Sequence, residues 1–317
     1  MKRGKISTKC GGVDVGKHWL DAAAHGLAGT TRVPNSVAGV RELIAWLRGH
    51  GVGRVGLEAS GGYERQACTG LAAAGFEVVL HQPLEVRLFA RLKRLRAKND
   101  RIDAALIAAA TAQVDAVKAA ADPRLQELAE RLTAYEQITD QLAELKTFME
   151  HVRLKDVASA LGQQIDSLAK LKQQLAREVI TRLKAHRDLL ARFRLLQSLP
   201  GFGPIVAASL VVRMPELGQM NRGQAAALAG VAPFDRDSGQ FKGLRFISGG
   251  RRRPRRLLYL AALSAKRCDP TFKDAADKLL ARGKPKKVVL VAVMRRLIET
   301  ANLVLARAQP WTKTAPA

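Results

Sequence analysis

Four acidic residues in the first third of the chain have the types and spacing needed for metal-dependent chemistry. Asp14 lies in Gly-Gly-Val-Asp-Val-Gly and Glu58 in Val-Gly-Leu-Glu-Ala-Ser-Gly-Gly. These short apolar runs bounded by glycine predict carboxylates on buried strands. Asp100 and Asp103 lie three residues apart in a helical, alanine-rich stretch, which puts them on one helix face. Four converging carboxylates repel one another, so we expect a hard divalent cation to neutralise them.

Each of these acids also has a simpler structural explanation. Asp14 could cap a turn, Glu58 could be the charge of an edge strand, and the other two could complement a helix dipole. Carboxylates inside apolar, glycine-flanked strands are harder to explain in that way, because burying a charge without a partner is costly. Together the four acids could hold a pair of cations that clamp the attacking and leaving oxygens of a phosphodiester.

A second candidate region is a loop rich in glycine and arginine between residues 235 and 256. Glycine allows the backbone to approach a ligand closely, and arginine binds phosphate through two hydrogen bonds. Seven basic residues without an acid follow Phe241 and are predicted to bind nucleic acid: Lys242, Arg245, Arg251, Arg252, Arg253, Arg255 and Arg256. Ser238 and Ser248 are both glycine-flanked, and each could be a nucleophile or only a turn residue.

The composition favours a polyanionic partner. The chain has 317 residues, with 53 Lys and Arg against 28 Asp and Glu, a net charge of +25. Such a charge predicts salt-dependent binding of DNA or RNA, in an enzyme or in a structural protein of the ribosomal kind. Cys10, Cys68 and Cys268 have no paired spacing, which argues against a disulfide framework and a zinc site. There is no signal-peptide pattern and no apolar run of about 20 residues, so we expect a cytoplasmic protein without a membrane segment.

The elements that must position the four acids form an α/β layer. Strands are predicted at 11–15, 19–25, 30–33, 54–58 and 77–81, with helices at 36–48 and 63–74, around a mixed sheet. A further helix over 84–96 carries leucines at 84, 88, 92 and 95, which we expect to pack. Its other side carries basic residues that we expect to face phosphate: Arg87, Arg91, Arg94 and Lys98.

A long helical segment follows. Apolar residues recur at spacings of three and four over 125–152 and again over 157–179, with Pro123 at the predicted start and Pro200 at the end. Pairing within one chain, as a hairpin, and pairing between chains, as a coiled coil, leave the same pattern. The stretch Leu-Pro-Gly-Phe-Gly-Pro after it is similar to a helix-hairpin-helix that grips a phosphate, or is an ordinary helix connection. We predict three domains: 1–122, 123–196 and a mostly helical 197–317.

Five motifs resemble one known family in the same order along the chain. They are Val-Asp-Val-Gly-Lys, Glu-Ala-Ser-Gly-Gly-Tyr, Lys-Asn-Asp-Arg-Ile-Asp-Ala, Leu-Pro-Gly-Phe-Gly-Pro and Asp-Ser-Gly-x-x-Lys-Gly-x-Arg-x-Ile-Ser-Gly-Gly-Arg. They are similar to the DEDD transposases of the insertion-sequence one-ten family, relatives of the Piv-type invertases. The resemblance implies a RuvC-like, ribonuclease-H-type fold in the first domain and a transposase domain at the C-terminus.

The same resemblance implies roles for residues and partners. Asp14, Glu58, Asp100 and Asp103 would be the Mg²⁺ ligands, and Ser238 would be the nucleophile that becomes linked to DNA. The helical arm would join protomers into a homodimer that assembles into a tetramer. A non-coding guide, the bridge RNA, would pair with donor and target DNA.

Three functions follow from these expectations. The first is a serine recombinase that cuts and rejoins DNA through a covalent intermediate. The second is a RuvC-like, structure-selective endonuclease in which metal-activated water attacks and the serine is structural. The third is a non-enzymatic architectural or RNA-binding protein, for which the carboxylates would be irrelevant.

Overall fold

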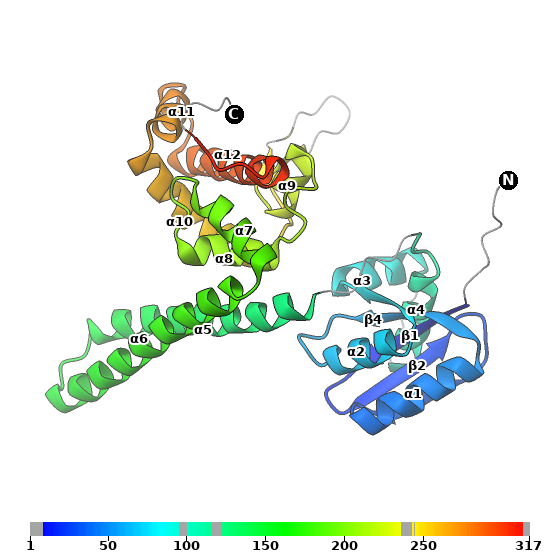
Figure 1. Ribbon diagram of the computed structural model, residues 1–317. Helices are drawn as coiled ribbons and strands as arrows, with labels where there is room; N and C mark the ends of the chain where they lie inside the picture. Colours follow the sequence, from blue (N-terminus) through cyan, green and yellow to red (C-terminus); the bar gives the residue numbers. More distant parts are fainter. Residues whose placement is uncertain (1–8, 95–99, 116–121, 236–242, 244, 313–317) are drawn as a thin grey trace. The chain divides into compact units, whose positions relative to one another are not determined.

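The computed structural model describes residues 9–94, 100–115, 122–235, 243 and 245–312, without the side chains of residues 100–102. The chain divides into two compact units, Met1–Ala120 and Ala121–Ala317 (Figure 1). The predicted boundary at 122 lies close to this division, and α5 and α6 belong to the second unit. A separate domain over 123–196 stays a prediction. Among the described residues, no helix is both long and apolar enough to cross a membrane.

The first unit is built on a mixed sheet of five strands in the order β3-β2-β1-β4-β5. β1 pairs antiparallel with β2, and β2 with β3, whereas β1, β4 and β5 run parallel. The strands are β1 (Lys9–Val15), β2 (Trp19–Ala24), β3 (Thr30–Pro34), β4 (Val52–Glu58) and β5 (Glu77–His81). The sequence-based prediction of all five strands and of a mixed α/β layer is therefore confirmed, with ends shifted by at most two residues.

The two faces of the sheet follow the alternation of side chains along each strand. Val13, Leu20 and Leu57 point to the face covered by α1 (Val37–Gly49) and α2 (Arg65–Ala73), where they share one apolar core with Leu43 and Leu71. Ser36 caps α1 by accepting a hydrogen bond from the amide of Gly39. The residues between these core positions must face the opposite side of the sheet.

That opposite side is covered by α4 (Asp100–Thr111), with α3 (Pro83–Leu92) beside it (Figure 1). Two strand glycines make the close approach possible. A Cβ atom on Gly12 would lie 2.2 Å from the carbonyl oxygen of Ala104, and one on Gly56 would lie 1.8 Å from the Thr111 hydroxyl. The glycines flanking the predicted carboxylates therefore serve helix packing.

The packing predicted for α3 is wrong. Leu84, Leu88 and Leu92 have exposed fractions of 62%, 53% and 75%, and the helix instead packs through Val86 and Phe89 against α4. The spacing of the leucines predicted one buried face. The face that contacts α4 is a different one and carries Val86 and Phe89. The basic residues Arg87, Arg91 and Arg94 are exposed as expected, whereas Leu95 and Lys98 lie outside the described residues.

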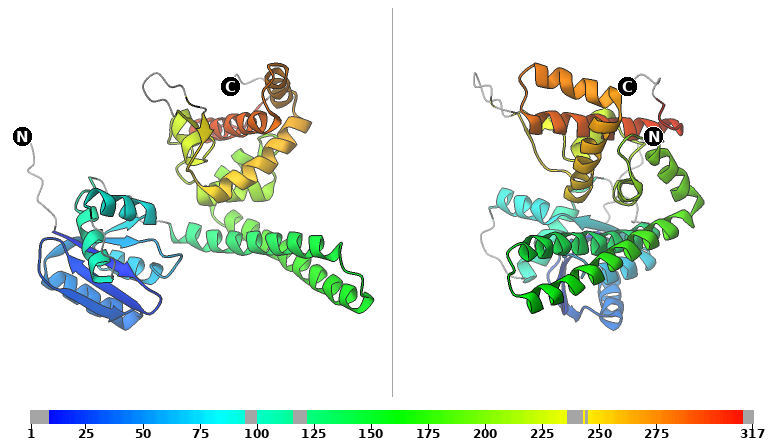
Figure 2. Two further views of the ribbon diagram at one scale, coloured as in Figure 1. Left: turned by 180° about the vertical axis from the view of Figure 1, so that it is seen from behind. Right: turned by 90° about the vertical axis from the view of Figure 1, so that its left-hand side faces the viewer.

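The second unit begins with a helical hairpin. Helices α5 (Pro123–Met149) and α6 (Lys155–Lys184) lie side by side and antiparallel (Figure 2). Two ion pairs show the direction: Glu127 contacts Arg182, and Arg131, one turn later on α5, contacts Glu178, one turn earlier on α6. Asp122 caps α5 with Pro123 in its first turn. Of the two arrangements that the sequence left open, the pairing within one chain is the one present; a coiled coil between protomers stays a prediction.

The remaining helices pack around one large core. They are α7 (Arg187–Gln197), α8 (Pro204–Arg213), α9 (Arg222–Leu228), α10 (Arg252–Cys268), α11 (Pro270–Ala281) and α12 (Lys286–Arg307). Residues 206–212 of α8 are all buried, as is one face of α12. A two-stranded ladder of β6 (Pro233–Phe234) and β7 (Phe246–Ile247) closes the loop between α9 and α10.

Candidate functional site

Asp14 and Glu58 lie on neighbouring strands and on the same face of the sheet. The parallel pairing of β1 and β4 places Val13 beside Leu57, and both point into the core. The next residue on each strand is Asp14 and Glu58, so these two carboxylates are neighbours on the face that α4 covers. Both are partly buried.

Helix α4 runs against the direction of β4 and delivers its first turn to the same end of the sheet. Near the start of β4, Arg54 Nη1 donates to the carbonyl of Val114, beyond the C-terminal end of α4. Farther along the strand, Gly56 meets Thr111. On neighbouring β1, Gly12 meets Ala104. The turn that precedes Ala104 therefore extends toward the ends of β1 and β4.

That first turn carries the other two predicted acids. Helix α4 begins at Asp100, and Asp103 is partly buried. Asp100 lies four positions before buried Ala104, and Asp103 lies four positions before buried Ile107. Residues at this spacing share one helix face, so both positions lie on the face that packs against the sheet. The backbone thus brings all four acidic positions to one end of the sheet, although the side chain of Asp100 lies outside the described part of the structure.

The donor chemistry of this set suits a hard divalent cation, because every contributed atom is a carboxylate oxygen. Among the side chains that are described, no group of three or more His, Cys, Asp or Glu is drawn close enough to hold a metal ion. Asp14, Glu58 and Asp103 would have to converge further, with Asp100, around a bound ion. Mutual repulsion of carboxylates opposes that convergence until a cation offsets it.

The loop that follows Glu58 is held in place by side chains that the sequence analysis did not identify. Glu64 Oε2 accepts hydrogen bonds from the Ser60 amide (3.0 Å), the Ser60 hydroxyl (2.8 Å) and the Gly62 amide (2.8 Å). Burial alone would raise the pKa of Glu64, but these hydrogen bonds outweigh it and the pKa is lowered. Asn35 Nδ2 donates to the carbonyls of Gly16 and Tyr63, which ties this loop to the β1–β2 turn.

Two further polar residues lie in the same transverse row of the sheet and were also missed. Asp21 on β2 pairs in register with Asp14, and His81 on β5 pairs with Glu58. His81 Nε2 lies 2.9 Å from the Thr111 hydroxyl, which itself donates to the Ile107 carbonyl and so accepts from the ring. Burial lowers the pKa of His81, against the opposing effect of nearby Glu85.

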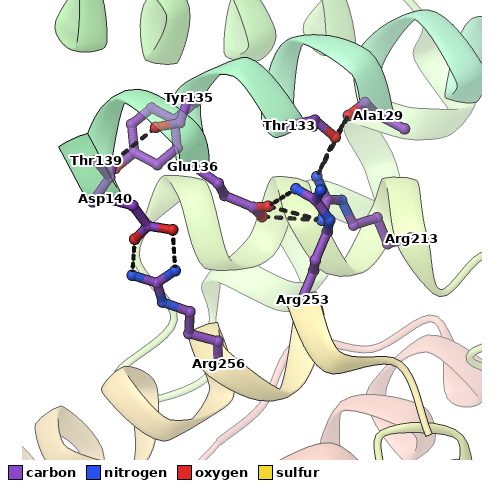
Figure 3. Close-up of polar contacts among 9 residues, drawn as sticks. All are labelled: Ala129, Thr133, Tyr135, Glu136, Thr139, Asp140, Arg213, Arg253 and Arg256. Carbon is purple, nitrogen blue, oxygen red and sulfur yellow. Dashed lines mark hydrogen bonds and ion pairs between the residues drawn. The ribbon is translucent and has the colours of Figure 1, made fainter. Parts of the chain in front are cut away.

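The basic segment before and within α10 makes ion pairs and hydrogen bonds inside the second unit. Arg253 contacts Glu136 of α5, and Arg256 forms a two-pronged contact with Asp140, with Nη1 2.7 Å from Oδ2 (Figure 3). Arg213 of α8 reaches Glu136 as well, at 3.0 Å. These contacts fasten the hairpin to α8 and α10.

The other arginines of this segment have their own contacts. Arg251 pairs with Glu216 at 2.6 Å, Arg255 donates to the carbonyls of Gly230 and Gly249, and Arg245 pairs with Asp235. Arg252 is exposed, and Lys242 lies outside the described residues. Because several guanidinium groups are already engaged in holding the fold, their predicted contact with nucleic acid stays a prediction and concerns exposed Arg252 first.

An acidic face on α5 also explains how so many arginines can begin a helix. The positive end of a helix dipole disfavours cations in the first turn. Helix α10 nevertheless starts with Arg252, Arg253, Arg255 and Arg256 and has no acid in its first turn. Glu136 and Asp140 supply the missing negative charge from α5. These acids lie 117 and 116 residues before Arg253 and Arg256 in the sequence, so the arginine-rich segment by itself resembled a surface without partners.

The two predicted nucleophiles and the helix-hairpin-helix stretch lie in the second unit. Ser238 lies outside the described residues, between β6 and β7 in the sequence, and Ser248 is exposed just after β7. In the Leu-Pro-Gly-Phe-Gly-Pro turn, Gly201 has a φ of 77° and a Cβ there would lie 2.3 Å from the Ala261 carbonyl. This turn is thus a packing contact with α10, and phosphate binding by it is a prediction.

Comparison with known proteins connects both units to one family. A profile of the IS110 DEDD transposases matches residues 11–157, and the profile "Transposase IS116/IS110/IS902 family" matches residues 193–277. The pilin gene-inverting proteins of Moraxella bovis and Moraxella lacunata are each 25% identical over 315 residues, which are 95% of this chain and 97% of the relative. An uncharacterized 42 kDa protein of insertion element IS900 from Mycobacterium paratuberculosis is 32% identical over 150 residues, 43% of this chain and 35% of that protein.

These matches cover the sheet with its acidic row and the helical unit with its glycine-rich loop. The relatives named after gene inversion extend over nearly the whole length. The chain belongs to the IS110 family of DEDD transposases and is a DNA-rearranging enzyme.

Proposed function

We propose that the chain cuts and rejoins DNA by phosphoryl transfer at the end of the sheet to which the backbone brings Asp14, Glu58, Asp100 and Asp103. The observation that carries this proposal is the direction of α4, which sends its acidic first turn to the ends of β1 and β4. A bound Mg²⁺ would polarise the scissile phosphate and stabilise its developing charge. The four carboxylates would hold that ion, and the exposed arginines of α3 would bind the DNA backbone nearby.

In this proposal Ser238 is the nucleophile. Its hydroxyl oxygen bonds to phosphorus as the bond from phosphorus to the leaving strand end breaks, and its proton passes to solvent. The phosphoester to the protein keeps the bond energy, so a second strand end can displace the serine without ATP. The similarity to gene-inverting proteins over nearly the whole chain supports rejoining, because an inversion needs every cut to be sealed.

Partners follow from the same reasoning. The net charge of +25 supports binding of donor and target DNA and of a guide RNA, and base identity would be left to pairing between nucleic acids. The α5–α6 hairpin would join protomers into a dimer and then a tetramer.

A covalent-adduct assay tests the nucleophile. Purified protein is incubated with Mg²⁺, its co-purified RNA and a plasmid carrying the flanks of its own gene, and protein linked to DNA is resolved on a denaturing gel. We expect an adduct with the wild type, none with Ser238→Ala, and an undiminished adduct with the matched control Ser248→Ala. If Ser238→Ala cuts DNA at the wild-type rate while Asp14→Ala is inactive, water is the nucleophile and the endonuclease interpretation replaces this one.

The guide is tested separately by sequencing the RNA that co-purifies with the protein. We expect one discrete transcript with segments complementary to donor and target. A heterogeneous mixture that reflects only RNA abundance would contradict guidance and leave a non-specific basic surface as the explanation.

A further inference from the structure

A buried carboxylate, Asp21, lies directly opposite Asp14. In the antiparallel pair of β1 and β2, Gly12 faces Ala23, Asp14 faces Asp21 and Val15 faces Leu20. Directly opposed residues share a face and have Cβ atoms about 4.5–5.5 Å apart. Asp21 therefore stands next to the acidic row, on the side away from Glu58, and its exposed fraction is only 5%.

The carboxylate of Asp21 is held in a fixed orientation by one arginine. Arg32 pairs in register with Asp21 from the next strand, β3. Its Nε donates to Oδ1 at 2.9 Å and its Nη2 donates to Oδ2 at 3.0 Å, so the guanidinium and carboxylate planes meet through two parallel hydrogen bonds. The side chain of Arg32 is half exposed, whereas that of Asp21 is almost covered.

The pair with Arg32 is a favourable cross-strand contact, but it does not explain why Asp21 stands opposite Asp14. Like charges directly opposite each other on two strands destabilise a sheet. A buried ion pair is also no more stabilising, in general, than well-packed apolar residues would be. The chain nevertheless places a second carboxylate against Asp14, and conflicts of this kind between local preference and fold concentrate at functional sites.

We propose that Asp21 is a positioning residue of the acidic site. With two of its lone pairs turned to Arg32, it can offer the remaining ones to water in the hydration shell of the cation held by Asp14 and Glu58. Magnesium keeps several of its waters when it binds to proteins, and carboxylates of the outer shell orient such ligands. Arg32 fixes the rotamer and offsets the added negative charge. This inference rests on the proposed metal site and adds to it a residue outside the four motif acids.

Magnesium binding without DNA tests the role, because it does not depend on catalysis. Calorimetric titration of the folded, DNA-free protein with Mg²⁺ gives a midpoint, the Mg²⁺ concentration at half saturation, which reports the affinity. For Asp21→Asn we expect that midpoint to rise about 10- to 100-fold, the range typical of lost outer-shell partners. An unchanged midpoint would overturn the inference.

The matched control is the Arg54–Glu77 ion pair, which joins two strands of the same sheet at its other end with Nε 2.8 Å from Oε2. Glu77→Gln also removes one carboxylate and one ion pair, yet it should leave the midpoint at the wild-type value. An equal rise in Glu77→Gln would show a general loss of sheet integrity and overturn a specific role for Asp21.

Two additional variants keep the outcomes separate. If Asp21→Asn does not fold, Arg32→Lys retains the charge but loses the two parallel hydrogen bonds, and we expect a smaller rise of the midpoint; no rise overturns the inference. Asp14→Asn should abolish the Mg²⁺ response. If Asp14→Asn binds Mg²⁺ like the wild type, the proposed metal site itself is wrong. If Asp14→Asn loses Mg²⁺ binding while Asp21→Asn keeps the wild-type midpoint, only the positioning role of Asp21 is refuted.

Discussion

The two units use acidic residues in opposite ways. In the second unit Glu136, Asp140 and Glu216 each receive guanidinium groups from arginines that lie far away in sequence. In the first unit the strand registers set Asp21, Asp14 and Glu58 in one row, acid beside acid, and Arg32 pairs with Asp21 at one side of that row. The comparison teaches that acids matched by distant arginines fasten helices together in the second unit, whereas in the first unit a sheet register sets acids side by side, an arrangement that a cation from solution would stabilise.

The largest effect should come from breaking the row in the first unit. Asp14→Asn keeps the shape of the side chain but removes a cation ligand, and we expect recombination to fall by about a thousandfold or more, roughly 4 kcal/mol of barrier. Since the substitution also relieves repulsion, the melting temperature without Mg²⁺ should not fall. A variant that unfolds more easily and still recombines would reverse the comparison.

In the second unit the corresponding change should affect stability. Glu136→Ala leaves Arg213, whose side chain is 9% exposed, without its carboxylate, and losing one member of a buried pair costs about 3 kcal/mol. Chemical denaturation of the purified chain should show this loss in the transition of the second unit. The Mg²⁺ midpoint of the first unit should stay unchanged; a shift there would mean that the two acidic sets are not independent.

A smaller effect is expected at the contact between sheet and α4. Gly12→Ala places a methyl group where the backbone of Ala104 and Ala108 lies within 2.2 Å, so the helix must move away. Overpacking of this kind costs about 1–3 kcal/mol. Because α4 carries Asp103, the recombination rate should fall by more than the loss of unfolding free energy alone would explain. Gly49→Ala, where a Cβ would meet no atom within 4 Å, is the matched control.

The smallest effect concerns pH. The hydrogen bond from Arg256 lowers the pKa of Asp140, so the folded state holds its proton less tightly than the unfolded state, whose value is about 3.9. The stabilisation is therefore complete above that unfolded value and is lost as pH falls through the lower, folded one. Asp140→Asn should reduce the melting temperature slightly at neutral pH and not at strongly acid pH. An equal reduction at both would contradict the assignment.

Strand pattern alone predicted most of the first unit. Alternation of apolar residues and glycine-bounded runs located all five strands, and they also placed Asp14 and Glu58 at strand ends. Asp21 could have been found by the same reasoning. The short turn at Lys17 and His18 folds β2 back on β1, and counting outward from it sets Asp21 opposite Asp14.

Contacts between distant elements could not be read from the sequence. Arg253 and Glu136 are 117 residues apart, and only the docking of the hairpin brings them together. The leucines of α3 show a second limit, because a helix with apolar residues on two sides does not reveal which side its neighbour covers. The role of Ser238 comes from resemblance to the family and stays a prediction.

The direction of α4 has an electrostatic consequence. Peptide dipoles align along a helix, so its N-terminal end carries about half a positive elementary charge. Because that end of α4 points toward Asp14 and Glu58, the backbone itself contributes a fixed, non-titrating positive potential where the carboxylates gather. This field favours the gathering of negative charge at that end of the sheet even before any ion arrives.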